Sequence, residues 1–452
     1  MADDDCSRPS FALVGKKGLV ITIILGLIIR MIIAPFLTYD FDIYHWGVIL
    51  ENIQSGNGLY ELAGYYYTPV WGYIMGFESE ILRFFDSLSA YGFRYEELLP
   101  VESFNYRFHT ATVTTLAFDF AMKIPLFIVD AITAGLVYIL IKDICSDEKK
   151  ACIGAFIWMM APLVIYMTAV QAMFDSISAM LMILIIILLR KDYRFIAGAV
   201  FAIAALLKLF PVFTIFVLLF YVIFKGRING TVKRDVLLTI SGAVIAGMII
   251  YIPQILDGTF IDSLSFIFAR ASEEVTMLQK LGSFFNYAVC IFGMIFFSYN
   301  MYKRHDDDLD KSMLFNALGA LICAVCISTT PQYVIVVLPL LIVYGVTYTP
   351  VLKKAAIVIV IGGFFAAIAA NTFPILSGAA VNLSLVDVQF ILDGLSWLET
   401  TTIFGTPIRD IIGLITTIIQ YSGVIVALIV LLTPTLKRIS PFLDKHLPEV
   451  EL

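Results

Sequence analysis

Long apolar runs separated by short polar connections recur along the whole length of this chain. A helix of roughly 18 or more apolar residues is long enough to cross the hydrocarbon core of a bilayer. The pattern predicts about twelve transmembrane helices, near 18–37, 112–141, 151–169, 174–189, 195–208, 211–224, 236–253, 281–302, 312–329, 332–348, 355–373 and 409–432. Only Leu209-Phe210-Pro211 separates the fifth run from the sixth. Because proline cannot continue a helix cleanly, we expect either a tight hairpin or one broken helix there.

The composition agrees with this pattern. The chain has 452 residues, of which 60% are hydrophobic and 15% are charged, whereas a soluble domain carries roughly 25% charged residues. We therefore predict an all-α fold, a polytopic transmembrane helical bundle. The net charge is −6, and no stretch is typical of a basic nucleic-acid-binding surface, so we expect membrane lipid and no nucleic acid as partners.

The basic residues predict the orientation. Most of the 30 Lys and Arg residues fall in connections on the same side of the bundle as the N-terminus, and cytoplasmic loops accumulate such residues. We therefore expect a multi-pass integral membrane protein with both termini in the cytoplasm, in the cell membrane of a prokaryote or the endoplasmic reticulum of a eukaryote. The predicted organisation is a cytoplasmic tail over 1–17, a transmembrane domain over 18–433 and a second tail over 434–452.

The outer connections are much longer than the inner ones. Three of them are long, at about 38–111, 254–280 and 374–408. The first includes amphipathic stretches such as 79–87, which predict helices lying along the membrane interface. Long loops carry function more often than short ones, so we expect chemistry on the outer face.

Two carboxylates lie one residue apart just past the first apolar run, at Asp40 and Asp42. Aromatic and polar rings follow them, including His45, Tyr60 and Tyr67. Flat rings cover the apolar face of a sugar, and carboxylates accept hydrogen bonds from its hydroxyl groups. The alternative is an aromatic belt at the membrane interface, but the adjacent carboxylates favour a sugar site.

The order of short motifs resembles a known family. The motifs are Asp40-x-Asp42, Gly56-x-x-x-Tyr60, Tyr67-Thr68-Pro69, Lys123-x-Pro125 with Asp130, Gln171 with Phe174-Asp175, Lys208-Leu209-Phe210-Pro211, Arg270 before Ser283-Phe284-Phe285, and Thr330-Pro331-Gln332-Tyr333. Over about residues 38–345 the chain resembles the GT-C class of membrane glycosyltransferases, and most closely the dolichyl-phosphate-mannose-dependent mannosyltransferases of GPI-anchor synthesis and related prokaryotic enzymes. It departs from their Asp-x-Asp-Tyr pattern, since Ile43 precedes Tyr44.

The resemblance implies a GT-C-like fold and a hexosyltransferase. Such an enzyme moves a hexose, mannose by analogy, from a polyprenyl- or dolichyl-phosphate donor to a lipid-linked, glycan or protein acceptor with inversion. It implies Asp40 as general base with Asp42 as helper, or the reverse. The implied donor-phosphate ligands are Lys208, Arg270 and Lys123, and the implied substrate-binding residues are His45, Tyr60, Tyr67, Asp175, Gln332 and Tyr333. No metal is required, although Asp40 and Asp42 have the spacing to hold one Mg²⁺ or Mn²⁺ beside a phosphate.

Structural roles stand beside several of these functional ones. Lys123 has a pairing partner at Asp119 one helical turn away, and Lys208 has the length to extend to the interface. Asp175 has the position of a helix cap, and Arg270 that of a solvated loop charge. Arg30, inside an apolar run, is expected to pair with an interior acid.

Two other classes of protein fit parts of the pattern. A secondary transporter or lipid flippase fits about twelve spans and the proline break, but it predicts charges near the bilayer midplane and two similar halves. A lipid-linked phosphotransferase is the third interpretation.

Overall fold

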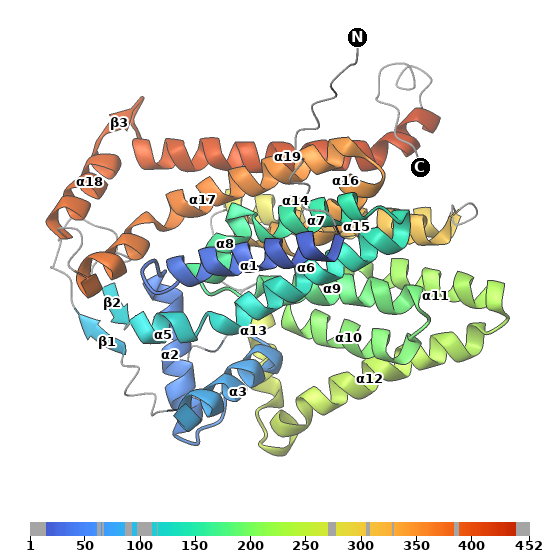
Figure 1. The fold of residues 1–452 in the computed structure, drawn as a ribbon, viewed down its shortest axis with the longest axis horizontal. Helices are drawn as coiled ribbons and strands as arrows, with labels where there is room; N and C mark the ends of the chain where they lie inside the picture. The colour runs from blue at the N-terminus through green and yellow to red at the C-terminus, as the bar shows by residue number, and fades with distance from the viewer. Residues whose placement is uncertain are drawn as a thin grey trace, which may run out of the picture.

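The described part of the chain is almost entirely helical (Figure 1). The computed structural model describes residues 15–60, 65, 67–85, 93–96, 111–114, 116–269, 277–303, 308–327, 330–383 and 388–439. Most helices run along the long axis of the molecule, and α18 (Val388–Thr400) with the two short strand pairs gathers at one end (Figure 1). The connection between α11 (Ile215–Asn229) and α12 (Val232–Leu256) lies at the opposite end.

The first part of the chain contains two longer helices, α1 (Gly15–Ile33) and α6 (Ile124–Cys145), and several shorter elements. The shorter helices are α2 (Asp40–Gln54), α3 (Pro69–Phe85) and α5 (Leu116–Ala121). Strands β1 (Phe93–Glu96) and β2 (Ala111–Thr114) pair antiparallel, with Phe93 opposite Thr114.

The middle of the chain is a series of helices with sharp connections. Its elements are α7 (Glu148–Met159), α8 (Pro162–Ala169), α9 (Asp175–Arg190), α10 (Arg194–Leu207), η2 (Phe210–Thr214), α11 (Ile215–Asn229), α12 (Val232–Leu256) and α13 (Phe260–Ala269). Helices α7 and α8 form one apolar stretch bent by 47°. Pro162 lies in the first turn of α8, where the missing N–H of proline costs no hydrogen bond.

The last part contains the longest helices. Its elements are α14 (Met277–Lys303), α15 (Leu309–Ala324), η3 (Val325–Ile327), η4 (Pro331–Ile335), α16 (Leu338–Thr347), α17 (Pro350–Leu383), α18 (Val388–Thr400), β3 (Thr402–Ile403), β4 (Thr406–Pro407) and α19 (Ile408–Ile439). The predicted long outer loops therefore contain regular structure, including α2, α3, α13 and α18.

Helices occupy all twelve predicted ranges, but not every one of these helices is long and apolar enough to cross a membrane. Among the described residues seven helices are long and apolar enough to cross a membrane, or eight with the bent pair α7–α8. Helices α9, α10 and α16 have 16, 14 and 10 residues, fewer than the ~20 that a full crossing needs. The long apolar helices are those of a multi-pass membrane protein.

The break at Pro211 is a hairpin. Arg194 at the start of α10 pairs with Asp235 at the start of α12, and α12 directly follows the end of α11. Helices α10 and α11 therefore run in opposite directions. Helices α10 and α12 cross closely, because a Cβ on Gly198 would lie 1.9 Å from the carbonyl oxygen of Thr239 and one on Gly242 would lie 2.0 Å from that of Phe195. Small residues permit such close approach between helices in a membrane.

The buried core lies around α9, α15 and α16. Every described residue of α15 from Met313 to Ala324 is buried. Helix α12 is the opposite case, since large apolar side chains such as Leu237, Met248 and Ile252 are exposed along it. Exposed apolar helix faces of this length suit contact with lipid.

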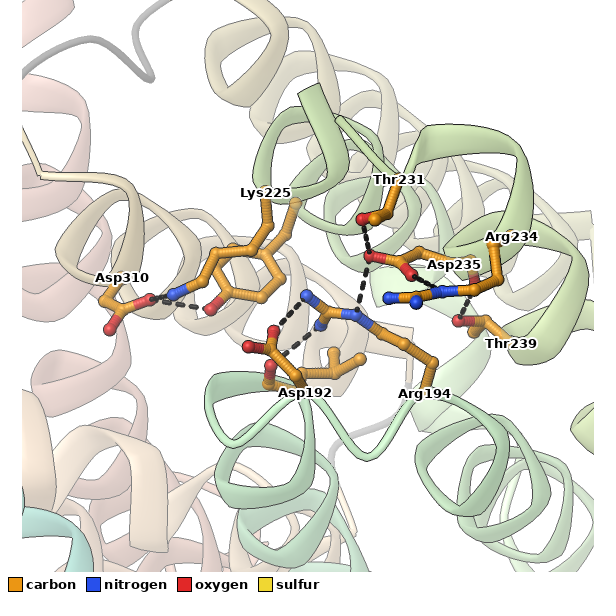
Figure 2. Close-up of polar contacts among 10 residues, drawn as sticks. Asp192, Arg194, Lys225, Thr231, Arg234, Asp235, Thr239 and Asp310 are labelled. Carbon is orange, nitrogen blue, oxygen red and sulfur yellow. Dashed lines mark hydrogen bonds and ion pairs between the residues drawn. The ribbon is translucent and has the colours of Figure 1, made fainter. Parts of the chain in front are cut away.

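Ion pairs hold the end of the bundle where α9 meets α10 and α11 meets α12 (Figure 2). Arg194 is 2% exposed and pairs with Asp192 and Asp235. Asp235 also accepts a hydrogen bond of 2.9 Å from the hydroxyl of Thr231. Lys225 lies 3.8 Å from Asp310 in the same region. Three of the basic residues used to predict orientation, Arg194, Lys225 and Arg234, are thus paired at one end of the bundle.

Candidate functional site

A tight turn between α8 and α9 organises the candidate site. Ala172 in this turn has φ +52° and is 1% exposed. A residue with a Cβ rarely adopts this left-handed conformation, and such strain concentrates at functional sites. The turn is stabilised by a hydrogen bond of 2.8 Å from the N–H of Met173 to the carbonyl oxygen of Met167. It presents Gln171 and Asp175 on either side of the strained residue.

Helix α2 is joined to this turn at its first residues. The N–H of Tyr39 donates a hydrogen bond of 2.9 Å to the carbonyl oxygen of Val170. Three residues later, Oδ2 of Asp42 accepts a hydrogen bond of 3.1 Å from Nε2 of Gln171. The two segments that carry Asp42 and Asp175 are therefore held together by backbone and side-chain contacts.

The surroundings of Asp42 favour its protonated form. Burial raises the pKa of this carboxyl to about 7, although the Gln171 hydrogen bond and the charge of Lys208 both lower it. The nearby carboxylate of Asp175 raises it further. A carboxyl group with a pKa near neutrality suits proton transfer, because it accepts and releases a proton at working pH.

Lys208 and Asp175 form an ion pair beside Asp42. Nζ of Lys208 lies 3.3 Å from Oδ1 of Asp175, and the two side chains are 10% and 0% exposed. Lys208 follows the last residue of α10, where the backbone becomes extended. The extended backbone at this point directs the chain into the hairpin and leaves the ammonium at the α8–α9 turn.

Aromatic rings surround the ammonium of Lys208. Nζ lies 4.5 Å from the ring centre of Phe174 and 5.6 Å from those of Tyr67 and Tyr333. Such ring faces attract a cation. Three predicted residues, Tyr67, Lys208 and Tyr333, thus meet around one charge, and Phe174 joins them.

Further rings pack behind this group. Trp71 stacks on Phe174 with ring centres 4.6 Å apart, and Trp46 lies 5.7 Å from Tyr67. The hydroxyl of Tyr60 donates a hydrogen bond of 2.8 Å to the carbonyl oxygen of Tyr67. Tyr60 therefore supports the site through the backbone of Tyr67.

His45 and Gln332 lie at the edges of this arrangement. The ring of His45 packs against Trp46 with centres 5.3 Å apart. Gln332 belongs to η4, next to Tyr333, and lines a cleft together with Gln171. His45 directly precedes Trp46 in the chain, and Gln332 directly precedes Tyr333.

Lys123 occupies a different environment from Lys208. Its ammonium is fully buried and donates hydrogen bonds to the carbonyl oxygens of Ala34 and Leu37 and to the hydroxyl of Thr38, at 2.7, 3.0 and 2.8 Å. An ammonium has three N–H donors, so these contacts with the segment that follows α1 occupy its donors. We therefore leave Lys123 out of the proposed phosphate site.

Two predicted residues lie outside the described parts of the structure. They are Arg270 and the side chain of Asp40, whose backbone begins α2. Among the described residues, no group of three or more His, Cys, Asp and Glu side chains is arranged to hold a metal ion.

The expected partner of Arg30 is Asp130. The two side chains are fully buried and lie 2.9 Å apart, and the hydroxyl of Thr168 donates a hydrogen bond of 2.8 Å to the same carboxylate oxygen. The prediction of a structural ion pair is confirmed. Arg30 belongs to α1, Asp130 to α6 and Thr168 to α8, so these contacts tie α1 and α6 to the helix that precedes the α8–α9 turn.

Sequence reasoning missed Gln171 as an individual site residue. It was recognised only as part of a resembling motif, because an amide side chain carries no charge pattern that singles it out. The one local signal is its place between an apolar helix and an acidic residue in a short connection.

The scan against protein-family models and the search of curated proteins found no match for this chain.

Proposed function

We propose that this protein is a GT-C-like membrane glycosyltransferase with about twelve spans. It would move a hexose, mannose by resemblance, from a polyprenyl- or dolichyl-phosphate donor to a lipid-linked, glycan or protein acceptor. The observation that carries the proposal is the meeting of Asp42, Lys208 and the aromatic rings at one turn. This combination supplies a base with a pKa of about 7, a cation beside it and flat apolar surfaces.

The proposed reaction is a single displacement. The acceptor hydroxyl loses its proton to the carboxylate of Asp42 while its oxygen forms a bond to C1 of the sugar. The bond between C1 and the phosphate oxygen breaks, and the lipid phosphate leaves with the electron pair. The transition state has oxocarbenium character, as in glycoside hydrolysis, and attack opposite the leaving group inverts C1.

Asp42 is the preferred base over Asp40 in this proposal. The hydrogen bond from Gln171 fixes the orientation of the Asp42 carboxylate, and burial tunes its pKa. A positioned base contributes roughly 10²–10⁴-fold to the rate of such a step. Asp40, one residue before Phe41, has the helper role.

Lys208 has the role of neutralising the donor phosphate. In the absence of donor, Asp175 compensates its charge at 3.3 Å. Phosphate oxygens attract Lys as a point charge, so the donor would share or replace the Asp175 contact. Arg270 is proposed as the second cation, on the basis of sequence alone.

The proposed site faces away from the cytoplasm. Asp175 begins α9 and Arg190 ends it, so the site and the paired basic residues of Figure 2 lie toward opposite ends of this helix. Cytoplasmic connections accumulate basic residues, and this supports the proposal that the site lies on the outer or lumenal side.

A transfer assay tests the function. Purified protein in lipid nanodiscs would be incubated with polyprenyl-phosphate [¹⁴C]mannose or polyprenyl-phosphate [¹⁴C]glucose and neutral octyl glycosides as acceptors. We expect radioactive sugar in the octyl glycoside fraction and free polyprenyl phosphate in equal amount. No sugar transfer from either donor to glycoside, lipid or peptide acceptors, together with substrate movement across the bilayer, would support the transporter interpretation instead.

A further inference from the structure

A cleft of about 620 Å³ opens between the α8–α9 turn, η4, α17 and α19. Its apolar wall is formed by Met167, Pro331 and the small residues of α17 and α19. Its polar lining consists of Gln171, Thr330, Gln332, Arg409, Asp410 and Thr417. Three of these six, Arg409, Asp410 and Thr417, lie beyond the region of about 38–345 that carries the family resemblance.

The walls of the cleft are held by close helix packing. A Cβ on Gly362 of α17 would lie 2.4 Å from the backbone nitrogen of Gln420 in α19. Nε2 of Gln420 donates a hydrogen bond of 3.2 Å to the carbonyl oxygen of Pro331 in η4. These contacts fix α17, α19 and η4 relative to one another, so the cleft is preformed.

The charge of the lining suits a neutral, hydroxyl-rich ligand. The charged lining residues are one cation, Arg409, and one anion, Asp410. Arg409 is paired with Glu399, so the cleft carries no excess of positive charge for a phosphate. Amide, hydroxyl and carboxylate groups together with a small apolar wall are the groups that bind sugars and polyols.

Gln171 connects the cleft to the candidate base. It lines the cleft, and its Nε2 donates to Oδ2 of Asp42 at 3.1 Å. Its Oε1 is buried and has no hydrogen-bond partner within the described part of the chain. A buried acceptor without a partner costs free energy, and a ligand hydroxyl entering from the cleft would satisfy it.

We infer that this cleft binds the acceptor of the proposed reaction, an uncharged glycan or polyol, and that Gln171 is a positioning residue that brings its hydroxyl to Asp42. The inference rests on the proposed function. It separates the two substrates, with the anionic donor at Lys208 and the neutral acceptor between η4, α17 and α19.

Photo-crosslinking tests the location independently of catalysis. The full chain in nanodiscs would be irradiated with octyl α-D-mannoside carrying a diazirine on the sugar, and labelled peptides would be identified by mass spectrometry. We expect label within 330–332, 366–370 or 409–417, with competition by unmodified octyl mannoside and little by mannose 6-phosphate. Asp410→Asn combined with Gln332→Ala should lower the labelling at least fivefold. Asp257→Asn, an exposed acid outside the cleft lining, should leave it unchanged.

Label outside the cleft, or labelling that the double variant leaves unchanged, would overturn the inference. Kinetics then separate it from the proposed function. In an active enzyme, Asp410→Asn should raise the acceptor KM at least fivefold with little change in the donor KM, and equal acceptor KM values in the variant and parent would count against the cleft. If the cleft is labelled but the protein transfers no sugar, the cleft would still be a glycoside-binding site, and the proposed transferase function would be rejected.

Discussion

The ammonium of Lys208 lies 3.3 Å from Oδ1 of Asp175, and the two side chains are almost completely removed from solvent. Taking two charges out of water is costly, and their attraction offsets the cost only when the geometry is good. The rings of Phe174, Tyr67 and Tyr333 add favourable contacts to the cation. The ion pair and the surrounding rings keep Lys208 in place when no sugar donor is bound. When the donor binds, its phosphate can replace the Asp175 carboxylate as the partner of Lys208.

Replacing Lys208 with Ala should weaken the use of donor. We expect kcat/KM for the polyprenyl-phosphate sugar to fall roughly 10–100-fold, which corresponds to the ~1.5–3 kcal/mol of a hydrogen bond to a charged group. Because the substitution also leaves Asp175 buried without its cation, a second variant, Lys208→Met with Asp175→Asn, keeps the site neutral. It should fold normally and remain deficient in donor use. Lys191→Ala, exposed at the other end of α9, is the control, and donor kinetics unchanged in both site variants would return Lys208 to a purely structural role.

Replacing Asp42 with Asn should remove the base while keeping its shape. The side-chain oxygen of Asn still accepts the hydrogen bond from Gln171, so the fold should be preserved. We expect transfer to fall roughly 10²–10⁴-fold, measured at saturating donor and acceptor. Asp40→Asn is the matched comparison, and a larger loss there than in Asp42→Asn would reverse the assignment of base and helper.

The pH dependence of transfer should report the pKa of Asp42. The base is active as a carboxylate, so the rate should rise with pH and level off above about 7. The Gln171 hydrogen bond lowers this pKa, because it stabilises the ionised form. Gln171→Leu should therefore move the acidic limb of the pH–rate profile to higher pH by ~1 unit. An acidic limb at the same pH in variant and parent would mean that the limb belongs to another group.

The Arg30–Asp130 pair should control stability. Arg30→Met leaves a buried carboxylate without its cation, and we expect a loss of ~3–5 kcal/mol in the free energy of unfolding, seen as a lower midpoint in a thermal-aggregation assay in detergent. Adding Asp130→Asn should recover much of the loss, because the remaining group is neutral. Arg234→Met removes an exposed cation, and because Asp235 keeps its buried partner Arg194, it should cost only ~0–1 kcal/mol. Equal midpoints for Arg30→Met and Arg234→Met would contradict this role of the buried pair.

The helical architecture could be predicted because it depends on local pattern. Apolar runs specify where helices form, and each predicted range is occupied by helix. The sequence pattern did not predict which of these helices are long enough to cross the membrane. Helices α9, α10 and α16 are shorter than a membrane crossing. Whether a short apolar helix is covered by protein or lipid depends on its neighbours.

The chemical character of the protein follows from its amino-acid sequence. Its hydrophobic runs require a membrane-like environment, its Lys and Arg residues concentrate in the connections on one side of the predicted bundle, and Arg30 inside an apolar run required an acidic partner. Which polar groups meet became evident only from the packing of the helices. Asp42 and Gln171 are 129 residues apart, and Lys123 contacts Ala34 across 89 residues. Such partners depend on how helices turn and pack, and this is why Lys208, but not Lys123, lies beside the candidate base.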